Sequence, residues 1–159
     1  MLVKNLMTKN PRSCSPSEAL NAAAHVMWEA DCGSIPIVDE ERHVVGFLTD
    51  RDICMAAYTQ GRLLSEIPIH AAMSNAVLSC RADDTVDAAE TQMRDARVRR
   101  LPVVNEERQL VGILSLNDLA REAAHPGHGH TTDAPQPADL AQTLAEICTP
   151  RWAASAPPA

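Results

Sequence analysis

The sequence predicts an α/β protein of the α+β type. We expect two β-α-β-β-α domains that are related by a pseudo-two-fold axis and packed through their sheets. The first observation is an internal repeat, because residues 7–57 match residues 73–123 without a gap, with 17 identities in 51 positions. The second is the hydrophobic pattern, which has helical spacing in one part of each copy and short apolar runs typical of strands in another. The third is size, because one copy of about 55 residues buries too little apolar surface to fold alone.

The elements follow in the same order in both copies. After a short first strand, we place the N-cap of a helix at Ser17 and at Asp83, because these aligned side chains can both cap a helix. Two strands follow as a hairpin around the polar turn Glu-Glu-Arg, and a second helix completes the copy. Gly46 and Gly112 are expected where a strand ends and the chain turns into that helix. The expected strands are 12–14, 34–39, 43–48, 78–80, 100–105 and 109–114, and the second helices lie near 50–59 and 116–124.

The first helix of each copy has one apolar stripe that should face the core. The two stripes match residue by residue: Leu20, Ala23, Met27 and Ala30 in one, Val86, Ala89, Met93 and Ala96 in the other. We divide the chain into a first domain, residues 1–62, and a second domain, residues 63–124. A pseudo-two-fold pair leaves two equivalent clefts where its halves meet.

The last part of the chain has no counterpart in the repeat. Residues 125–138 are expected to form a flexible linker, and their histidines (His125, His128 and His130) have no Cys or carboxylate at ligand spacing before Asp133, so we expect no metal site. Within residues 139–159, Asp139 can cap a short helix that ends before Pro150, and a disordered tail follows. Such a helix is too short to persist alone, so its apolar side (Leu140, Leu144 and Ile147) should dock on its own module or on a second subunit.

Composition excludes several classes of protein. The net charge of −7 repels phosphate backbones and anionic membranes, so we expect no nucleic-acid partner and no membrane association. The five cysteines are odd in number and contain no C-x-x-C, which argues against a disulfide framework or structural zinc and favours a reducing compartment. No apolar run has the length of a signal peptide or a membrane span, and we expect a cytoplasmic protein.

Several paired motifs resemble one known family. Met7-Thr8 and Met73-Ser74 stand at the entry to the copies, "IPIVD" and "LPVVN" form a strand in each, and "GFLTDRDI" and "GILSLNDL" end them. Together, over residues 1 to 124, they resemble a tandem pair of CBS domains, named for cystathionine β-synthase, of the stand-alone bacterial kind. The resemblance implies a regulatory module. Many such modules bind AMP, ADP, ATP, NAD or S-adenosylmethionine in the inter-domain clefts, and they often form homodimers.

Thr49 and Asp52 allow two interpretations, as do Ser115 and Asp118 in the second copy. The spacing is that of a capping-box variant, in which the hydroxyl and the carboxylate satisfy amides at a helix N-terminus. The resemblance implies a ligand site instead, in which the Asp accepts hydrogen bonds from the ribose hydroxyls and the Thr or Ser approaches a phosphate. Both copies keep the pair, so neither cleft is disabled at this position.

The arginines differ between the copies. Arg99 and Arg100 precede "LPVV", where the resemblance implies basic side chains that meet phosphate, and their counterparts Gly33 and Ser34 carry no charge. We therefore expect unequal clefts, one of them better at holding phosphates, and Arg51 could add a further charge. Solvated arginines remain the alternative.

Adenine recognition is assigned by family position alone. The positions are Ser13, Cys14, Ile35, Pro36, Ser79, Cys80, Leu101 and Pro102. Each of them could equally be part of the core, and Cys14 and Cys80 would then act as small buried hydrophobic residues.

The motifs of common enzymes are missing from the sequence. We found no nucleophile beside a base at motif spacing, no P-loop and no G-x-G-x-x-G, so we expect neither catalysis nor a catalytic cofactor. The sequence therefore predicts a non-catalytic sensor in signal transduction, which binds an adenosyl nucleotide and acts on an unknown target protein. The alternative is a ligand-free interaction module that dimerises through its helices and presents its C-terminal tail to a partner.

Overall fold

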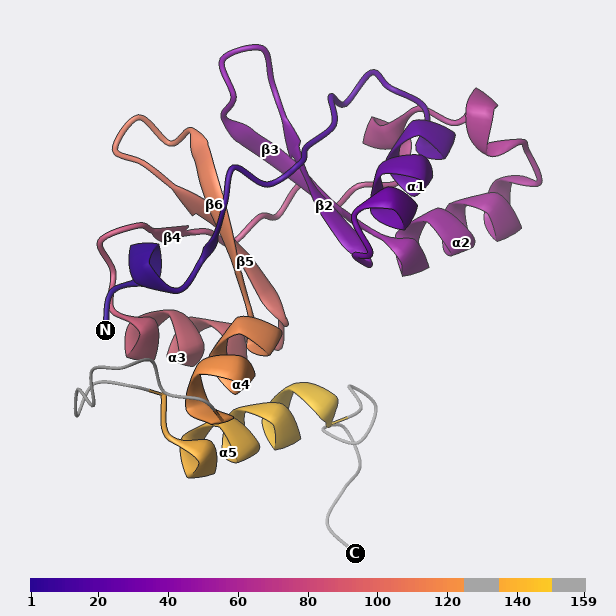
Figure 1. The fold of residues 1–159 in the computed structure, drawn as a ribbon. Coiled ribbons are helices and arrows are strands. Elements are labelled where there is room, and N and C mark those ends of the chain that lie inside the picture. The colour runs from indigo at the N-terminus through magenta and orange to yellow at the C-terminus, as the bar shows by residue number, and fades with distance from the viewer. Residues whose placement is uncertain (125–134, 150–159) are drawn as a thin grey trace, which may run out of the picture. The chain divides into compact units, whose positions relative to one another are not determined.

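The computed structural model of the chain describes residues 1–124 and 135–149, and it confirms the mixed α/β class (Figure 1). The chain forms two compact units. The first-copy unit contains residues 10–79 and 104–111, and the second-copy unit contains residues 1–9, 80–103 and the chain from Gly112 onward. Because the units interleave along the chain, the domain boundaries at residues 62 and 124 stay a prediction.

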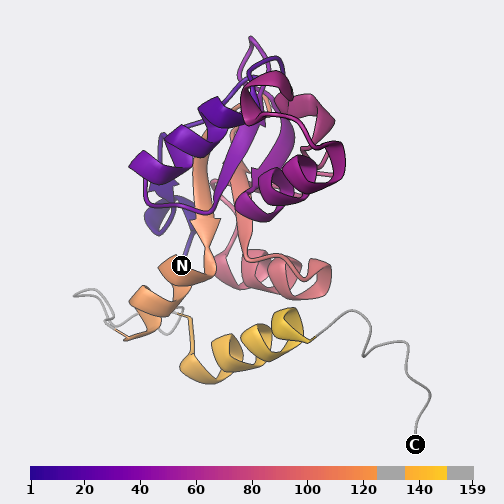
Figure 2. The same ribbon diagram turned by 90° about the vertical axis from the view of Figure 1, so that its right-hand side faces the viewer.

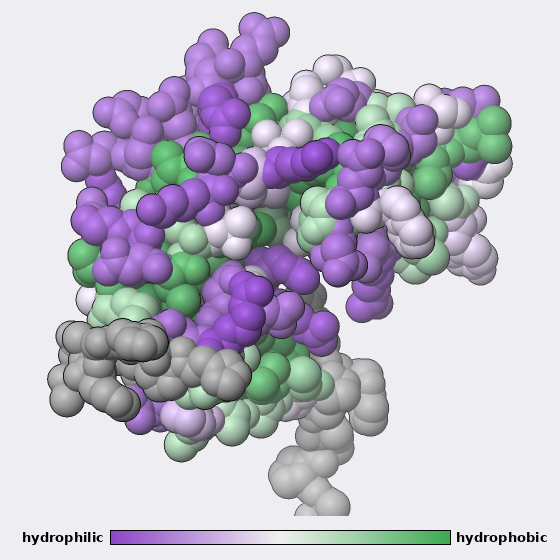
Figure 3. Space-filling model, viewed as in Figure 1, coloured by the Kyte–Doolittle hydropathy of each residue, from purple (hydrophilic) through white to green (hydrophobic). Residues whose placement is uncertain are grey.

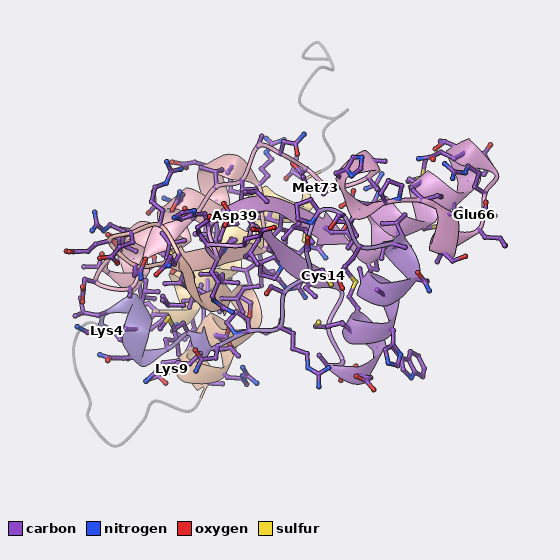
Figure 4. The ribbon with its side chains drawn as sticks, turned by 90° about the horizontal axis from the view of Figure 1, so that it is seen from above. Lys4, Lys9, Cys14, Asp39, Glu66 and Met73 are labelled. Carbon is purple, nitrogen blue, oxygen red and sulfur yellow. The ribbon has the colours of Figure 1, made fainter. Side chains whose placement is uncertain are left out.

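The first-copy unit contains a two-stranded antiparallel sheet and two helices. Strand β2 (Ser34–Val38) is buried along its whole length and pairs with β3 (Val44–Thr49), so that Ile35 lies opposite Leu48. Helices α1 (Leu20–Glu29) and α2 (Asp50–Gln60) contact each other and close an aliphatic core with the sheet. The predicted strand at 12–14 is reduced to one parallel bridge from Cys14, which is labelled in Figure 4, to Ile37.

The second-copy unit contains most of a four-stranded sheet in the order β1-β6-β5-β4, of which only Val104, Leu110 and Val111 belong to the first-copy unit. Its strands are β4 (Cys80–Arg81), β5 (Arg100–Val104), β6 (Leu110–Ser115) and β1 (Thr8–Lys9), which the sequence did not predict and which pairs antiparallel with β6. Helices α3 (Val86–Ala96) and α4 (Leu116–Ala124) correspond to α1 and α2.

The segment that precedes each copy packs on the other copy. Short 3-10 helices carry the contacts: η1 (Val3–Asn5) before the first copy, and η2 (Leu64–Glu66) and η3 (Ile69–Ala71) before the second. The N–H of Leu20 donates to the carbonyl of Ile67 over 2.9 Å, and the N–H of Val86 donates to the carbonyl of Met1 over the same distance. Met1 and Ile67 are equivalent positions of the repeat, so this exchange of segments is symmetric.

The exchange also explains the two repeated glycines. Gly46 lies inside β3 and Gly112 inside β6, not at strand ends, so that prediction was wrong. A Cβ at Gly46 would overlap the sulfur of Met73, and one at Gly112 would overlap the sulfur of Met7 (Met73 is labelled in Figure 4). Both glycines therefore make room for the methionine of an incoming segment.

The predicted N-caps at Ser17 and Asp83 were wrong. These residues lie in turns in which the N–H groups of Glu18 and Asp84 donate to the carbonyls of Ser15 and Arg81. The helices begin later, after Ala19 and Thr85, and only Thr85 caps with its side chain, accepting from the N–H of Ala88 over 3.2 Å. The local pattern misled because the first amides of both helices find their acceptors in a distant segment.

The predicted C-terminal helix exists, and its inward side differs from the prediction at one position, Leu144. Helix α5 (Pro137–Cys148) starts two residues before Asp139 and packs on α3 and α4 of its own unit (Figures 1 and 2). Leu140 is buried and Ile147 half-buried, whereas Leu144, predicted to be inside, is 40% exposed. Thr143 is buried instead, because its hydroxyl donates to Glu90 Oε1 over 2.8 Å. No helix within the described ranges is long and apolar enough to cross a membrane.

Candidate functional site

Thr49 and Asp52 form a complete capping box at the start of α2. The N–H and the hydroxyl of Thr49 both donate to Asp52 Oδ2, over 2.9 and 2.7 Å, and the N–H of Asp52 donates to Thr49 Oγ1 over 3.2 Å. The other carboxylate oxygen, Oδ1, accepts no hydrogen bond from any residue that the structure describes. The cap therefore orients the carboxylate and leaves one oxygen able to accept from a ligand.

Ser115 and Asp118 repeat this geometry at the start of α4. The N–H and the hydroxyl of Ser115 donate to Asp118 Oδ2 over 2.9 and 2.6 Å, and the N–H of Asp118 donates back to Ser115 Oγ over 3.3 Å. Here, however, Arg121 Nη2 donates to Oδ1, and the Asp118 side chain is only 5% exposed. The equivalent position in the first copy is Met55, which cannot make this ion pair.

Charge differs around the two helix starts. The carbonyl of Arg99 accepts from the N–H of Leu116 over 3.0 Å, which places Arg99 beside the start of α4, and Arg100 follows as the first residue of β5. Arg94 and Arg97 lie at the C-terminal end of α3 and not at the start of a helix.

The start of α2 carries an acid at the corresponding place. The N–H of Asp50 donates to the carbonyl of Gly33 over 3.1 Å, and Asp50 Oδ1 accepts from the N–H of Arg51 over 2.7 Å. The Asp50 carboxylate lies over Gly33, because a Cβ there would come within 2.9 Å of Asp50 Oδ2. Arg51 itself is exposed. Two arginines therefore adjoin the start of α4, whereas an acid adjoins the start of α2, and the unequal clefts stay a prediction.

Most of the positions proposed for adenine lie in the core. Cys14, Ile35, Pro36, Cys80, Leu101 and Pro102 are buried, whereas Ser13 and Ser79 are half-buried. Burial, with a smaller contribution from Glu18, raises the pKa of the Cys14 thiol to about 11. Burial, with the nearby charge of Asp84, raises the pKa of the Cys80 thiol to about 12. Both thiols are protonated at neutral pH, so neither is a reactive thiolate.

Sequence reasoning missed Ser34. Its side chain is 4% exposed, and its hydroxyl has no hydrogen-bond partner among the described residues. Ser34 lies directly opposite Thr49 in the β2–β3 register, so the two side chains are on the same face of the sheet. An unpaired buried hydroxyl costs stability, which makes this one a candidate ligand contact. The sequence offered one signal for Ser34, which is its alignment with Arg100 in the repeat.

One group of side chains within the described ranges has the composition of a cation site. Asp39, Glu41 and His43 place one potential ligand atom each within 4.8 Å of one another, in the turn after β2. Asp39 accepts from the N–H of His43 over 2.8 Å, so the turn itself accounts for their proximity. His125, His128 and His130 lie outside the described residues.

The comparisons agree with the repeat and with the fold. The family model described as "CBS domain" matches twice, over residues 3–58 and 64–125. The CBS domain-containing protein YhcV of Bacillus subtilis is 36% identical over 118 residues, which are 74% of this chain and 82% of that protein.

Two similar solved structures contain adenosyl ligands. The CBS domain pair of protein MJ0100, in complex with 5′-methylthioadenosine and S-adenosyl-L-methionine, is 27% identical with a TM-score of 0.71, covering 78% of this chain and 96% of that one. CBSX2 in complex with AMP is 25% identical with a TM-score of 0.68, covering 77% and 96%. The chain therefore belongs to the CBS domain family and contains two CBS domains in tandem.

Proposed function

We propose that this protein is a non-catalytic sensor that binds an adenosyl compound of the AMP, ATP, NAD or S-adenosylmethionine class through the starts of α2 and α4. The observation that carries the proposal is the Asp52 carboxylate, which the capping box holds in place with Oδ1 unpaired. Two vicinal ribose hydroxyls are suitable donors to such a carboxylate. The ligands of the similar structures, AMP, 5′-methylthioadenosine and S-adenosylmethionine, all contain a ribose and support this assignment.

We assign the remaining contacts by chemistry. Thr49 and Ser115 have hydroxyls near a helix start, where an anion is favoured, and would approach a phosphate. Arg99 and Arg100 would bind phosphates in the second copy, and Arg51 would do so in the first. The adenine ring would meet the backbone around Pro36 and Pro102, because the side chains beside them are buried and apolar. The sites at the starts of α2 and α4 would then accept the same nucleoside but differ in their preference for phosphate.

The regulatory effect follows from differential binding. A ligand shifts a conformational equilibrium only as far as it prefers one arrangement, and a change from 1:99 to 99:1 needs a preference of about 10⁴-fold.

We propose the cytoplasm as the location, since all five cysteines are free thiols. The absence of catalysis is part of the proposal, and the protonated state of the Cys14 and Cys80 thiols supports it.

Thermal unfolding with a ligand panel tests the proposal. A ligand present at 100 times its dissociation constant raises the free energy of unfolding by about 2.7 kcal/mol. We expect at least one of AMP, ATP, NAD and S-adenosylmethionine to raise the melting temperature at millimolar concentration. Mass spectrometry of small molecules released from the purified protein should identify the same compound. Unchanged melting temperatures with all four would contradict the proposal.

A second function, ligand-free association through the helices, is favoured by one observation. Trp28 on α1 is 87% exposed and Tyr58 on α2 is 81% exposed, and apolar residues reach the surface of this unit (Figure 3). Exposed aromatic side chains of this kind are enriched at protein interfaces. In the second copy, α5 packs on the equivalent helices. We propose that the α1–α2 face binds a second copy of the chain to form a homodimer, and that a target protein binds elsewhere.

Light scattering tests the association. Trp28→Ala combined with Tyr58→Ala should convert a dimer to a monomer, whereas Glu40→Ala, a substitution at an exposed residue in the hairpin turn, should leave it a dimer. An unchanged mass of the double variant would refute this use of the face. Deletion of residues 135–159 distinguishes the two functions, because the ligand-free alternative requires the tail and the sensor does not.

A further inference from the structure

We propose that Arg121 makes the two ribose positions unequal, so that a nucleoside binds first at Asp52 and only at higher concentration at Asp118. The inference rests on the proposed function and goes further, because it ranks the two sites and names the residue responsible. Asp52 and Asp118 are equivalent in the repeat and have the same cap. They differ in what else contacts the carboxylate.

Asp118 has no unpaired oxygen. Ser115 donates twice to its Oδ2, and Arg121 donates to its Oδ1. Asp52 has the same two bonds on Oδ2 and none from the described residues on Oδ1. A ribose diol that approaches Asp118 must share or displace the guanidinium, whereas at Asp52 it meets an unpaired acceptor.

The position of Arg121 on the helix explains the contact. Residues three apart on a helix are neighbours, so Arg121 reaches back by one turn to Asp118. Its own side chain is 75% exposed, and exposed ion pairs generally contribute little. This pair differs from most exposed ion pairs, because the carboxylate is buried and the hydrogen bond is charge-assisted. Met55, at the same position in the first copy, has no donor to offer Asp52.

Ser34 independently indicates that the first copy is the better nucleoside site. Its buried hydroxyl lacks a partner and lies opposite Thr49 on the same sheet face. The second copy has Arg100 at this position, so it offers no small hydroxyl there. Two features of the first copy, the Oδ1 of Asp52 and the buried hydroxyl of Ser34, therefore have no partner among the described residues and can accept hydrogen bonds from a polar ligand.

Adenosine is the appropriate probe, because it has the ribose but no phosphate that Arg99 and Arg100 could attract. For the wild-type protein, calorimetry should resolve two dissociation constants that differ by about tenfold or more, the size expected for one charge-assisted hydrogen bond. Asp52→Asn should remove the tighter constant and Asp118→Asn the weaker one.

Matched substitutions exchange the residues of the two copies. Arg121→Met should tighten the weaker constant by about tenfold, while Arg121→Lys, which keeps a donor, should retain most of the difference. Met55→Arg should weaken the tighter constant by a similar factor. Ser34→Ala should weaken adenosine binding at the first copy without lowering the melting temperature, since it removes an unpaired buried hydroxyl.

The outcomes separate the inference from the proposed function. If Arg121→Met leaves both constants unchanged, or if Asp118→Asn removes the tighter one, the ranking is wrong while adenosyl binding stands. If adenosine, AMP, ATP and S-adenosylmethionine all fail to bind the wild-type protein, the proposed function is refuted and the ranking with it.

Discussion

Removal of the Thr143 hydroxyl should loosen α5 from the second-copy unit. Thr143 is fully buried and donates to Glu90 Oε1, which belongs to a side chain that is 5% exposed. In Thr143→Val the shape is kept, but a buried carboxyl oxygen loses its only donor among the described residues. Leaving one buried polar group unsatisfied costs about 1–3 kcal/mol, so we expect a loss of about 2 kcal/mol in the free energy of unfolding.

A double-mutant cycle distinguishes this hydrogen bond from general packing. Thr143→Val combined with Glu90→Met replaces both partners by apolar groups of similar size, which is often close to neutral, so the double variant should recover most of the loss. Urea unfolding followed by circular dichroism measures the free energies, and hydrogen exchange of the α5 amides shows whether the loss is local. A cost below about 0.5 kcal/mol for Thr143→Val, or costs that simply add, would refute the reasoning.

Three further predictions follow from packing and ionisation. Gly46→Ala should lower the free energy of unfolding in urea by about 1–3 kcal/mol, because the new Cβ meets the Met73 sulfur. Combination with Met73→Ala should recover part of the loss, and equal stability of Gly46→Ala and the wild-type protein would contradict the packing of Met73 against Gly46. A thiol reagent should label the exposed Cys54 in the native protein and leave the buried Cys80 unlabelled until unfolding; rapid native labelling of Cys80 would contradict its burial. Because the thiol pKa values of Cys14 and Cys80 are raised, the native state keeps these protons above pH 9, where the unfolded state loses them. The free energy of unfolding should therefore fall as the pH rises from 9 towards 11, and Cys14→Ala combined with Cys80→Ala should flatten that fall. An unchanged slope would refute the assignment.

The repeat made most of the fold predictable. Strands β2, β3, β5 and β6 and helices α2 and α4 were expected within a residue or two of their observed bounds, because each boundary could be inferred from both copies. The capping boxes at Thr49 and Ser115 were also visible, since they are local in the chain. What failed was non-local: the first helices begin at Leu20 and Val86 because Ile67 and Met1 supply the acceptors.

The remaining errors have similar causes. Gly46 could not be interpreted from its own neighbourhood, because the reason for it is Met73 from the segment before the next copy. Leu144 on α5 was misjudged because hydrophobic periodicity favoured it as an inward residue, whereas Thr143 is inward instead and bonds a buried glutamate on another helix. The Arg121–Asp118 pair was within reach of sequence reasoning, because the alignment sets Arg121 against Met55 on the same helix face as the aspartate.

Calorimetric titration of AMP into the wild-type protein and into the Asp52→Asn, Asp118→Asn double variant tests the central claim most directly. The account predicts binding by the wild-type protein at micromolar to millimolar concentration and loss of at least tenfold in affinity in the double variant, because both ribose acceptors are changed while each asparagine can still accept from the cap. Circular dichroism and melting temperature check that the variant is folded. AMP binding of equal affinity in both proteins would contradict the claim that these carboxylates hold the ribose.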